Sequence, residues 1–174
     1  MAIAGLTEVT QFLTFHLGQE VFAIDISRIK EVLEYTDVTK IPRTPDFMCG
    51  VINLRGSVVP VVDLRLKFDM SKSEKTVNTC IIIIDVNQED GAAVIGALVD
   101  SVKEVMELDP NQIEPAPRIG TGLRSDFVRG MGKQGNQFVI LLDTDRLFST
   151  AELSLLQEAG GKGSGKSAPT EKAA

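Results

Sequence analysis

A strand–turn–strand segment at residues 50–64 constrains the fold of this chain most strongly. It reads Gly-Val-Ile-Asn-Leu-Arg-Gly-Ser-Val-Val-Pro-Val-Val-Asp-Leu, with apolar runs on both sides of Arg55-Gly56-Ser57. Turn residues between β-branched runs predict a β-hairpin, with a positive φ at Gly56. Pro60 has no N–H for a ladder, so its strand is predicted to lie at an edge or to carry a bulge there. Arg55 would then be a lone cation at the hairpin tip.

The same arrangement returns at residues 126–143. A second match joins residues 30–34 (Lys-Glu-Val-Leu-Glu) to residues 103–107 (Lys-Glu-Val-Met-Glu) at an offset of 73, so the second copy gained seven residues between the matches. Loops accept such insertions at small cost, so the pattern indicates a duplicated strand-rich unit. The alternative is chance similarity between two amphipathic hairpins. Five pairs share the constant offset of 80 residues: Asp46 and Asp126, Phe47 and Phe127, Gly50 and Gly130, Asp63 and Asp143, and Phe68 and Phe148.

Local patterns predict further elements. Residues 11–17 and 20–25 flank Gly18-Gln19, which indicates a hairpin with a two-residue turn. Residues 26–33 carry apolar side chains three to four positions apart, which predicts a short helix. The continuous β-branched run at residues 80–84 is typical of a strand that is buried on both faces.

These patterns divide the chain into segments. The region between the two repeats is polar and charged, which is typical of a connector. Near the C-terminus, helical spacing after Ser149 and Thr150 predicts a capped helix, and the Gly-, Lys- and Ser-rich residues beyond it predict a disordered tail. The expected segments are repeat one at about 10–68, a linker at 69–78, repeat two at about 79–148, a helix at 150–158 and the tail at 159–174.

Composition favours an ordinary soluble protein. Of the 174 residues, 43% are hydrophobic and 24% are charged. The net charge of −6 argues against nucleic acid as a partner, because phosphate binding needs clustered cations. The longest apolar stretch, residues 92–99, is far shorter than the roughly 18 residues of a membrane span, and residues 1–10 lack the basic start of a signal peptide. We therefore expect a cytoplasmic protein, with Cys49 and Cys80 as reduced core thiols.

Catalytic and cofactor sites have little support. The single histidine, His16, cannot build a catalytic triad or a zinc site alone. Asp63 and Asp143 end matched strands, where caps of the following turn are commoner than acid–base pairs. Residues 160–167 fit the letters of a phosphate-binding loop, but no strand precedes them and no helix follows. Residues 130–135 match the sequence pattern of a dinucleotide-binding loop, but they are interpreted as a turn between two strands.

The motif Phe-x-x-Gly-Val-Ile-Asn-Leu-Arg-Gly at residues 47–56, followed by Val-Pro-Val-Val-Asp-Leu-Arg at residues 59–65, resembles the signature of the CheW family of bacterial chemotaxis coupling proteins. Residues 22–26, 41–45 and 113–117 extend the resemblance, which covers about residues 11–156. It implies a mainly all-β fold with two SH3-like five-stranded β-barrel lobes and an apolar groove shared by them. Whether each repeat closes its own barrel or trades strands with the other stays open.

The resemblance also implies a role and a set of contact residues. The role is a non-catalytic adaptor that joins methyl-accepting chemoreceptor tips to the regulatory domain of the histidine kinase CheA, without cofactor or metal. For Gly50, Ile81 and Glu31, the alternatives are backbone geometry, core packing and a solvated charge, respectively. The tip at residues 132–136 is less distinctive, which leaves the contacts of the second lobe open. The residues matched to partner-binding positions are Asn53, Arg55 and Gly56 in the turn, Ile29 and Glu31 on the same face, and Gly50 and Ile81 near the groove between lobes.

Other functions remain open at this stage. A stand-alone kinase-regulatory domain, or a CheV-like coupling domain of the kind found in receiver-linked adaptors, would share the same motifs. An enzyme of unrecognised type is a further alternative. No receiver-like sequence follows in this chain, which favours the simple coupling protein.

Overall fold

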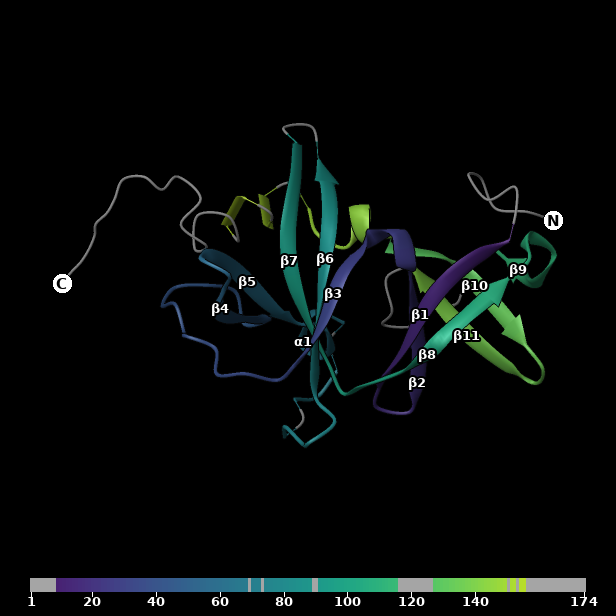
Figure 1. The fold of residues 1–174 in the computed structure, drawn as a ribbon, viewed down its shortest axis with the longest axis horizontal. Helices are drawn as coiled ribbons and strands as arrows, with labels where there is room; N and C mark the ends of the chain where they lie inside the picture. The colour runs from purple at the N-terminus through teal and green to yellow at the C-terminus, as the bar shows by residue number, and fades with distance from the viewer. Residues whose placement is uncertain are drawn as a thin grey trace.

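The computed structural model describes residues 9–115 and 127–155, apart from positions 69, 73, 89, 90, 150 and 153. Strands with short helical turns between them make up the described part (Figure 1), which confirms the expected all-β class. In chain order the elements are β1 Thr10–Leu17, β2 Glu20–Asp25, the 3-10 turn η1 Ile26–Arg28, β3 Ile29–Glu34, β4 Met48–Leu54, β5 Ser57–Asp63, α1 Leu64–Lys67, β6 Cys80–Gln88, β7 Gly91–Val99, β8 Ser101–Leu108, η2 Pro110–Gln112, β9 Ile113–Glu114, β10 Val128–Gln134, β11 Gln137–Leu142 and η4 Thr144–Arg146.

The strands form two sheets, and each sheet combines strands from both repeats. One sheet, which we call lobe A, has the order β8-β1-β2-β11-β10-β9, and the other, lobe B, has the order β3-β6-β7-β5-β4. In Figure 1 the purple β1 and β2 accordingly lie with the green C-terminal strands, and the teal β6 and β7 lie with the blue β3, β4 and β5. The first hairpin of each repeat therefore completes the lobe of the other repeat.

Strand pairing shows that the two lobes are equivalent. In lobe A, Leu141 pairs in parallel with Ala23, and in lobe B, Val61 pairs in parallel with Gly96. Leu141 follows Val61 by 80 residues and Gly96 follows Ala23 by 73 residues, which are the two offsets found in the sequence. The duplication is thus visible strand by strand, and the seven extra residues of the second copy fall between β8 and β10.

Lobe A has six strands where five were expected. The additional strand, β9, is only two residues long, and its Glu114 pairs with Met131 of β10. Lobe B has an isolated bridge between Thr39 and Val51, and Val51 is the counterpart of Met131 at the offset of 80. The difference between five and six strands is therefore the extension of one bridge by a single residue pair.

The helix expected at residues 26–33 is not present. Asp25 instead caps the 3-10 turn η1, and β3 then pairs with β6. A register shift between Ile29 and Glu31 inserts an extra residue into β3, so apolar positions that would alternate in a regular strand fall three apart. The bulge thus produces an apolar spacing like that of a helix, but the segment forms a strand because its backbone pairs with β6.

Pro60 does not lie on an edge strand, contrary to the sequence prediction. β5 has β4 on one side and β7 on the other, and the register shift of this hairpin is at Met48 and Gly50 in β4. Val51, opposite Pro60, bonds through both its N–H and its C=O to Thr39 at 2.9 Å. Since the pairing with β7 begins only at Val61, the missing N–H of Pro60 interrupts neither ladder.

The largest core lies between the two sheets and contains residues of both lobes. Phe68 stacks on Phe127 with 4.7 Å between ring centroids, and the counterpart pair, Phe148 and Phe47, lies 6.2 Å apart. Each pair joins one ring from each repeat. Phe22 of β2 stacks on Phe68 at 5.4 Å and so ties the hairpin of lobe A to this centre. Aromatic pairs at these distances favour offset stacking, and each ring buries a large apolar area.

Strand β6 contributes to two cores at once. Ile82 and Ile84 belong to the core between the sheets, whereas Ile81 and Ile83 belong to the separate core of lobe B. All four side chains are fully buried. The expected strand with two buried faces is therefore confirmed.

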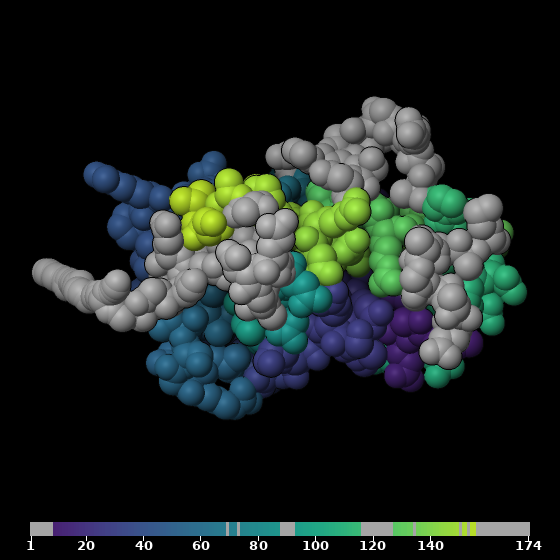
Figure 2. All heavy atoms as spheres, turned by 90° about the horizontal axis from the view of Figure 1, so that it is seen from above, coloured from purple at the N-terminus to yellow at the C-terminus, as the bar shows by residue number. Residues whose placement is uncertain are grey.

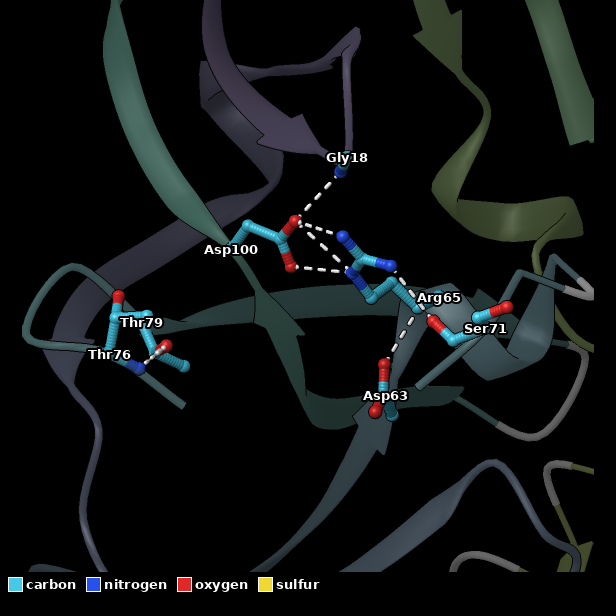
Figure 3. Close-up of polar contacts among 7 residues, drawn as sticks. All are labelled: Gly18, Asp63, Arg65, Ser71, Thr76, Thr79 and Asp100. Carbon is cyan, nitrogen blue, oxygen red and sulfur yellow. Dashed lines mark hydrogen bonds and ion pairs between the residues drawn. The ribbon is translucent and has the colours of Figure 1, made fainter. Parts of the chain in front are cut away.

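A polar clamp joins the lobes where β7 meets β8 (Figure 3). The Asp100 carboxylate accepts hydrogen bonds from Nε and Nη2 of Arg65, at 2.8 and 2.7 Å, and from the N–H of Gly18 at 2.7 Å. Arg65 lies on α1 of lobe B, and Gly18 lies in the β1–β2 turn of lobe A. Arg65 also donates to the carbonyl of Ser71 at 2.8 Å, which holds the start of the linker.

A second clamp occupies the equivalent place with its charges exchanged. Asp145 stands at the position that corresponds to Arg65 at the offset of 80. Its carboxylate pairs with Arg28 of η1 and accepts a hydrogen bond from the N–H of Asn87 in β6 at 2.9 Å. In both clamps a carboxylate bonds to an arginine and to a backbone N–H. This N–H belongs to the β1–β2 turn in the first clamp and to β6 in the second. The duplication preserved the arrangement but not the residue types.

The C-terminal segment begins as expected from the sequence. Ser149 caps it, because the N–H of Glu152 donates to Ser149 Oγ at 3.1 Å and Glu152 accepts from the N–H of Ser149 at 2.8 Å. Lys67 Nζ lies 3.2 Å from both Glu152 oxygens and also faces the rings of Phe47 and Phe148. Figure 2 shows this yellow segment next to the blue part of the chain. The tail at residues 159–174 lies outside the described residues.

Several smaller expectations can be compared with the structure. Asp63 caps α1 and Asp143 caps η4, so both carboxylates act as caps, as predicted. Residues 130–134 belong to strand β10, so the interpretation of residues 130–135 as a turn was wrong except at Gly135. No helix in the described part of the chain is long and apolar enough to cross a membrane.

Gly50→Ala should destabilise lobe B strongly. The φ of Gly50 is 144°, and a Cβ atom there would lie 2.1 Å from the carbonyl oxygen of Thr39. We expect a loss of about 3 kcal/mol or more in the free energy of unfolding, measured by urea denaturation, because relief would break the Thr39–Val51 bridge. Gly56→Ala is the matched control: its φ is 89° but nothing lies within 4 Å of the added atom, so about 1 kcal/mol is expected. Equal losses would contradict the steric explanation.

Asp100→Asn should lower the free energy of unfolding at pH 7 by about 2 kcal/mol, because charge-assisted hydrogen bonds to Arg65 and Gly18 are weakened. Burial raises the pKa of Asp100, but the hydrogen bonds and charge of Arg65 and the N–H of Gly18 lower it below its ordinary value of 3.8. A carboxyl with a lowered folded pKa stabilises fully above its unfolded pKa, and this contribution disappears as pH falls through the folded pKa.

The difference in the free energy of unfolding between the parent and Asp100→Asn should therefore be constant near neutral pH and shrink below pH 3.8. Urea denaturation at several pH values measures it. The control is Glu20→Gln, an exposed carboxylate on β2, for which a change within about 0.5 kcal/mol is expected. A difference that stayed constant at low pH would rule out the ionised clamp as its cause.

Candidate functional site

The candidate site is the tip of the β4–β5 hairpin in lobe B. The two turn residues have positive φ, 53° at Arg55 and 89° at Gly56, which is the backbone of a two-residue hairpin turn. Asn53 accepts a hydrogen bond from the N–H of Gly56 through Oδ1 at 2.9 Å. Asparagine before the turn and glycine within it therefore serve the turn geometry. They leave the Arg55 side chain projecting from its tip.

Arg55 is not the lone cation that the sequence suggested. Its two terminal nitrogens bond to the two oxygens of Glu31, at 2.5 and 2.8 Å. Hydrogen bonds from Arg55 hold the pKa of the Glu31 carboxyl below its ordinary value, and the same bonds raise the pKa of Arg55. Because Glu31 lies on β3 and Arg55 follows β4, the pair connects the two edge strands of the lobe B sheet. No local pattern joins these residues, which are 24 positions apart.

The pair leaves Arg55 able to bind further groups. Its side chain is 70% exposed, whereas that of Glu31 is 26% exposed. A guanidinium has five N–H donors in a fixed plane, and Glu31 engages only one edge of it. The remaining donors suit carboxylates or backbone carbonyls of a partner. This arrangement offers hydrogen-bond donors at the surface, as recognition of another protein requires.

The pair occurs in only one lobe. At the offset of 80, Arg55 corresponds to Gly135, and at the offset of 73, Glu31 corresponds to Glu104. Gly135 also has a positive φ, 62°, so the turn itself is preserved in lobe A. The two hairpin tips therefore share a backbone but present different chemistry.

The structure brings together only part of the predicted set. Glu31, Asn53, Arg55 and Gly56 meet at the tip, as described. Ile29 is half-buried against the core between the sheets. Gly50 is buried beneath Thr39 and Val38. Ile81 is fully buried inside the core of lobe B. A side chain at Ile81 has no surface to offer a partner, and Gly50 meets a backbone requirement, so partner contacts at these positions stay predictions.

The described residues offer little for catalysis. No group of three or more His, Cys, Asp or Glu side chains that could hold a metal ion lies among them. Cys49 and Cys80 are free and half-buried. Burial raises the pKa of the Cys49 thiol to about 11, so it is neutral and weakly nucleophilic at pH 7.

Sequence reasoning missed two groups of polar residues. One is the pair of clamps around Asp100 and Asp145, for which the exchange of Arg65 for Asp145 at the repeat offset was a usable signal. The other is a group of cations, Arg43 among them, that lines a hollow near the linker. Their residues are far apart in the sequence and share no motif, so only the fold brings them together.

Comparison with known proteins identifies the family. A family model described as a CheW-like domain matches residues 11–152. The chain is 40% identical over 154 residues to a chemotaxis protein CheW of Klebsiella aerogenes, covering 88% of this chain and 90% of that protein. It is 30% identical over 154 residues to a chemotaxis protein CheW of Treponema pallidum, covering 86% and 88%. A crystal structure of the scaffolding protein TtCheW from Thermoanaerobacter tengcongensis matches with a TM-score of 0.74 at 35% identity, covering 82% of this chain and 94% of that one. The chain therefore belongs to the CheW family.

Proposed function

We propose that this chain is a non-catalytic adaptor that couples methyl-accepting chemoreceptors to the histidine kinase CheA in chemotaxis signalling. Relatives named as chemotaxis proteins, and a similar structure described as a scaffolding protein, support a scaffold role. The observation that carries the finer proposal is the exposed Arg55 at a rigid turn, held in one orientation by Glu31.

The geometry of the tip suits an interface. Holding Arg55 in place by two hydrogen bonds reduces the rotamer freedom that binding would otherwise remove. Arginine is favoured at the centres of interfaces, because its planar group directs hydrogen bonds while its stem provides contact area. We assign the tip to the chemoreceptor, because the matched turn of the family is associated with that contact.

The second partner would meet another part of the surface. The exchange of hairpins and the two clamps fix the lobes against each other. Two partners bound to such a body would be held at a defined distance and angle. Recruitment to membrane-associated receptor arrays would then follow from receptor binding.

Arg55→Ala should weaken binding to a soluble chemoreceptor tip by at least about tenfold, because the guanidinium donors at the interface are lost. Its melting temperature should stay within a few degrees of the parent, since exposed substitutions have small effects. Affinity for the receptor tip and for the CheA regulatory domain is measured separately by calorimetry. Unchanged affinity for the receptor tip would refute the assignment of Arg55.

Matched variants separate charge from geometry. Arg55→Lys keeps the charge but removes the planar fork, so we expect it to bind the receptor tip more weakly than the parent. Glu31→Gln keeps Arg55 but weakens its fixation, and an intermediate affinity is expected. Lys133→Ala, an exposed cation of β10 in lobe A, should bind as the parent does. Equal losses in Lys133→Ala and Arg55→Ala would indicate general charge attraction instead of a defined contact.

A further inference from the structure

A hollow with a volume of about 640 Å³ lies in lobe B, between the segment that joins β3 to β4 and the linker that follows α1. None of the seven residues matched to partner-binding positions lines it. Its walls carry four cations: Lys40 and Arg43 on one side, and Lys72 and Lys75 on the other. The volume is in the range of roughly 300–1,000 Å³ that is usual for specific binding pockets.

The first wall, residues 38–46, is held by hydrogen bonds within it and to β4. Thr39 forms the bridge to Val51, Thr44 Oγ1 donates to the carbonyl of Ile41 at 2.9 Å, and the N–H of Met48 donates to the carbonyl of Pro45 at 2.9 Å. This wall is therefore ordered although it contains no regular strand.

Arg43 stands out within this wall. Its φ is 63°, a left-handed conformation that non-glycine residues rarely adopt and that costs about 1 kcal/mol or more. The side chain is exposed and makes no hydrogen bond or ion pair with any residue that the structure describes. Strained backbone that presents a cation without a polar partner suits a position that serves recognition.

The second wall is the linker, which is attached at both ends. Arg65 bonds to the carbonyl of Ser71 at its start, and Thr76 and Thr79 bond to each other at its end, through the N–H of Thr76 and Thr79 Oγ1 at 2.8 Å (Figure 3). Between these points Lys75 Nζ lies 5.2 Å from the centre of the Tyr35 ring, which also lines the hollow. Lys72 and Lys75 of this wall therefore line the same hollow as Lys40 and Arg43.

Between the walls lies a floor that contains Met48 and Leu66, together with the neutral thiol of Cys49. Two carboxylates, Asp46 and Asp63, also line the hollow, but Asp63 is buried and accepts the N–H of Arg65 as the cap of α1. Cations on facing walls above a floor of low polarity focus a positive potential. On a chain with net charge −6, such a concentration of cations is selective for anionic groups.

We propose that this hollow binds an acidic peptide segment of a partner protein, with carboxylates that reach the cations of both walls and an apolar side chain that packs on Met48 and Leu66. The apolar floor favours a peptide over a small inorganic anion, which would leave that floor uncovered. The inference concerns a surface separate from the Arg55 tip and stands whether or not the tip binds a chemoreceptor.

The test uses the full chain and a blocked peptide with two leucines flanked on each side by two glutamates. Calorimetry at low salt should show one saturable site, and affinity should fall as the salt concentration rises, because charge pairs at the rim are screened. The same peptide with glutamine in place of glutamate should bind at least about tenfold more weakly. Equal binding of both peptides, or no binding of the glutamate peptide, would overturn the proposal.

Variants locate the site. Arg43→Asn suits the left-handed backbone, because asparagine tolerates positive φ, and Arg43→Asn with Lys72→Gln should reduce affinity at least about tenfold with an unchanged melting temperature. Lys133→Gln, which removes an exposed cation in lobe A, is the matched control and should bind as the parent does. Equal losses in control and double variant would overturn the proposal. Binding of inorganic phosphate that depended on Arg43, without peptide binding, would overturn the peptide assignment as well.

Discussion

The exchange of hairpins between the two repeats is the constraint on which the rest of this structure depends. Neither sheet can form from one repeat, because β1 and β2 complete lobe A while β6 and β7 complete lobe B. The core between the sheets obeys the same rule, since Phe68 stacks on Phe127 and Phe47 packs against Phe148 across the repeats. Separating the lobes would therefore break backbone ladders as well as apolar contacts. A body held in this way transmits a fixed geometry from one surface to another.

Duplication gave the two lobes one backbone, and divergence gave them different surfaces. The clamps around Asp100 and Asp145 lie at corresponding junctions with the acidic and basic residues exchanged, so an ion pair joins the elements in each case. At the hairpin tips the opposite occurred. The turn is preserved at Gly135 and a glutamate is kept at Glu104, but glycine stands where lobe B has Arg55, so the ion pair with Glu31 has no counterpart there. The adaptor role proposed above needs this asymmetry, because two identical tips would compete for the same partner.

Local sequence signals predicted what is local in this fold. The hairpin at Gly18, the caps at Asp63 and Asp143 and the buried run in β6 follow from turn chemistry, capping and hydrophobic pattern. Strand exchange could not be predicted, because either mode of closure places the same apolar residues in a core. The bulge in β3 disguised a strand as a helix, since one inserted residue changes a period of two into a spacing of three. The pairing of Arg55 with Glu31 likewise depends on the strand topology, so no sequence pattern near Arg55 could predict it.

The cations of this acidic chain illustrate the same division between what builds the fold and what remains for recognition. Arg28 and Arg65 are largely covered and paired with carboxylates of another element, so their charges hold the lobes together. Arg55 is paired but exposed, so it combines a role in joining two edge strands with free donors. Arg43 is exposed and strained and has no partner among the described residues. Since Arg43 presents its charge without a polar partner from an ordered wall, its position suits the acidic ligand proposed above.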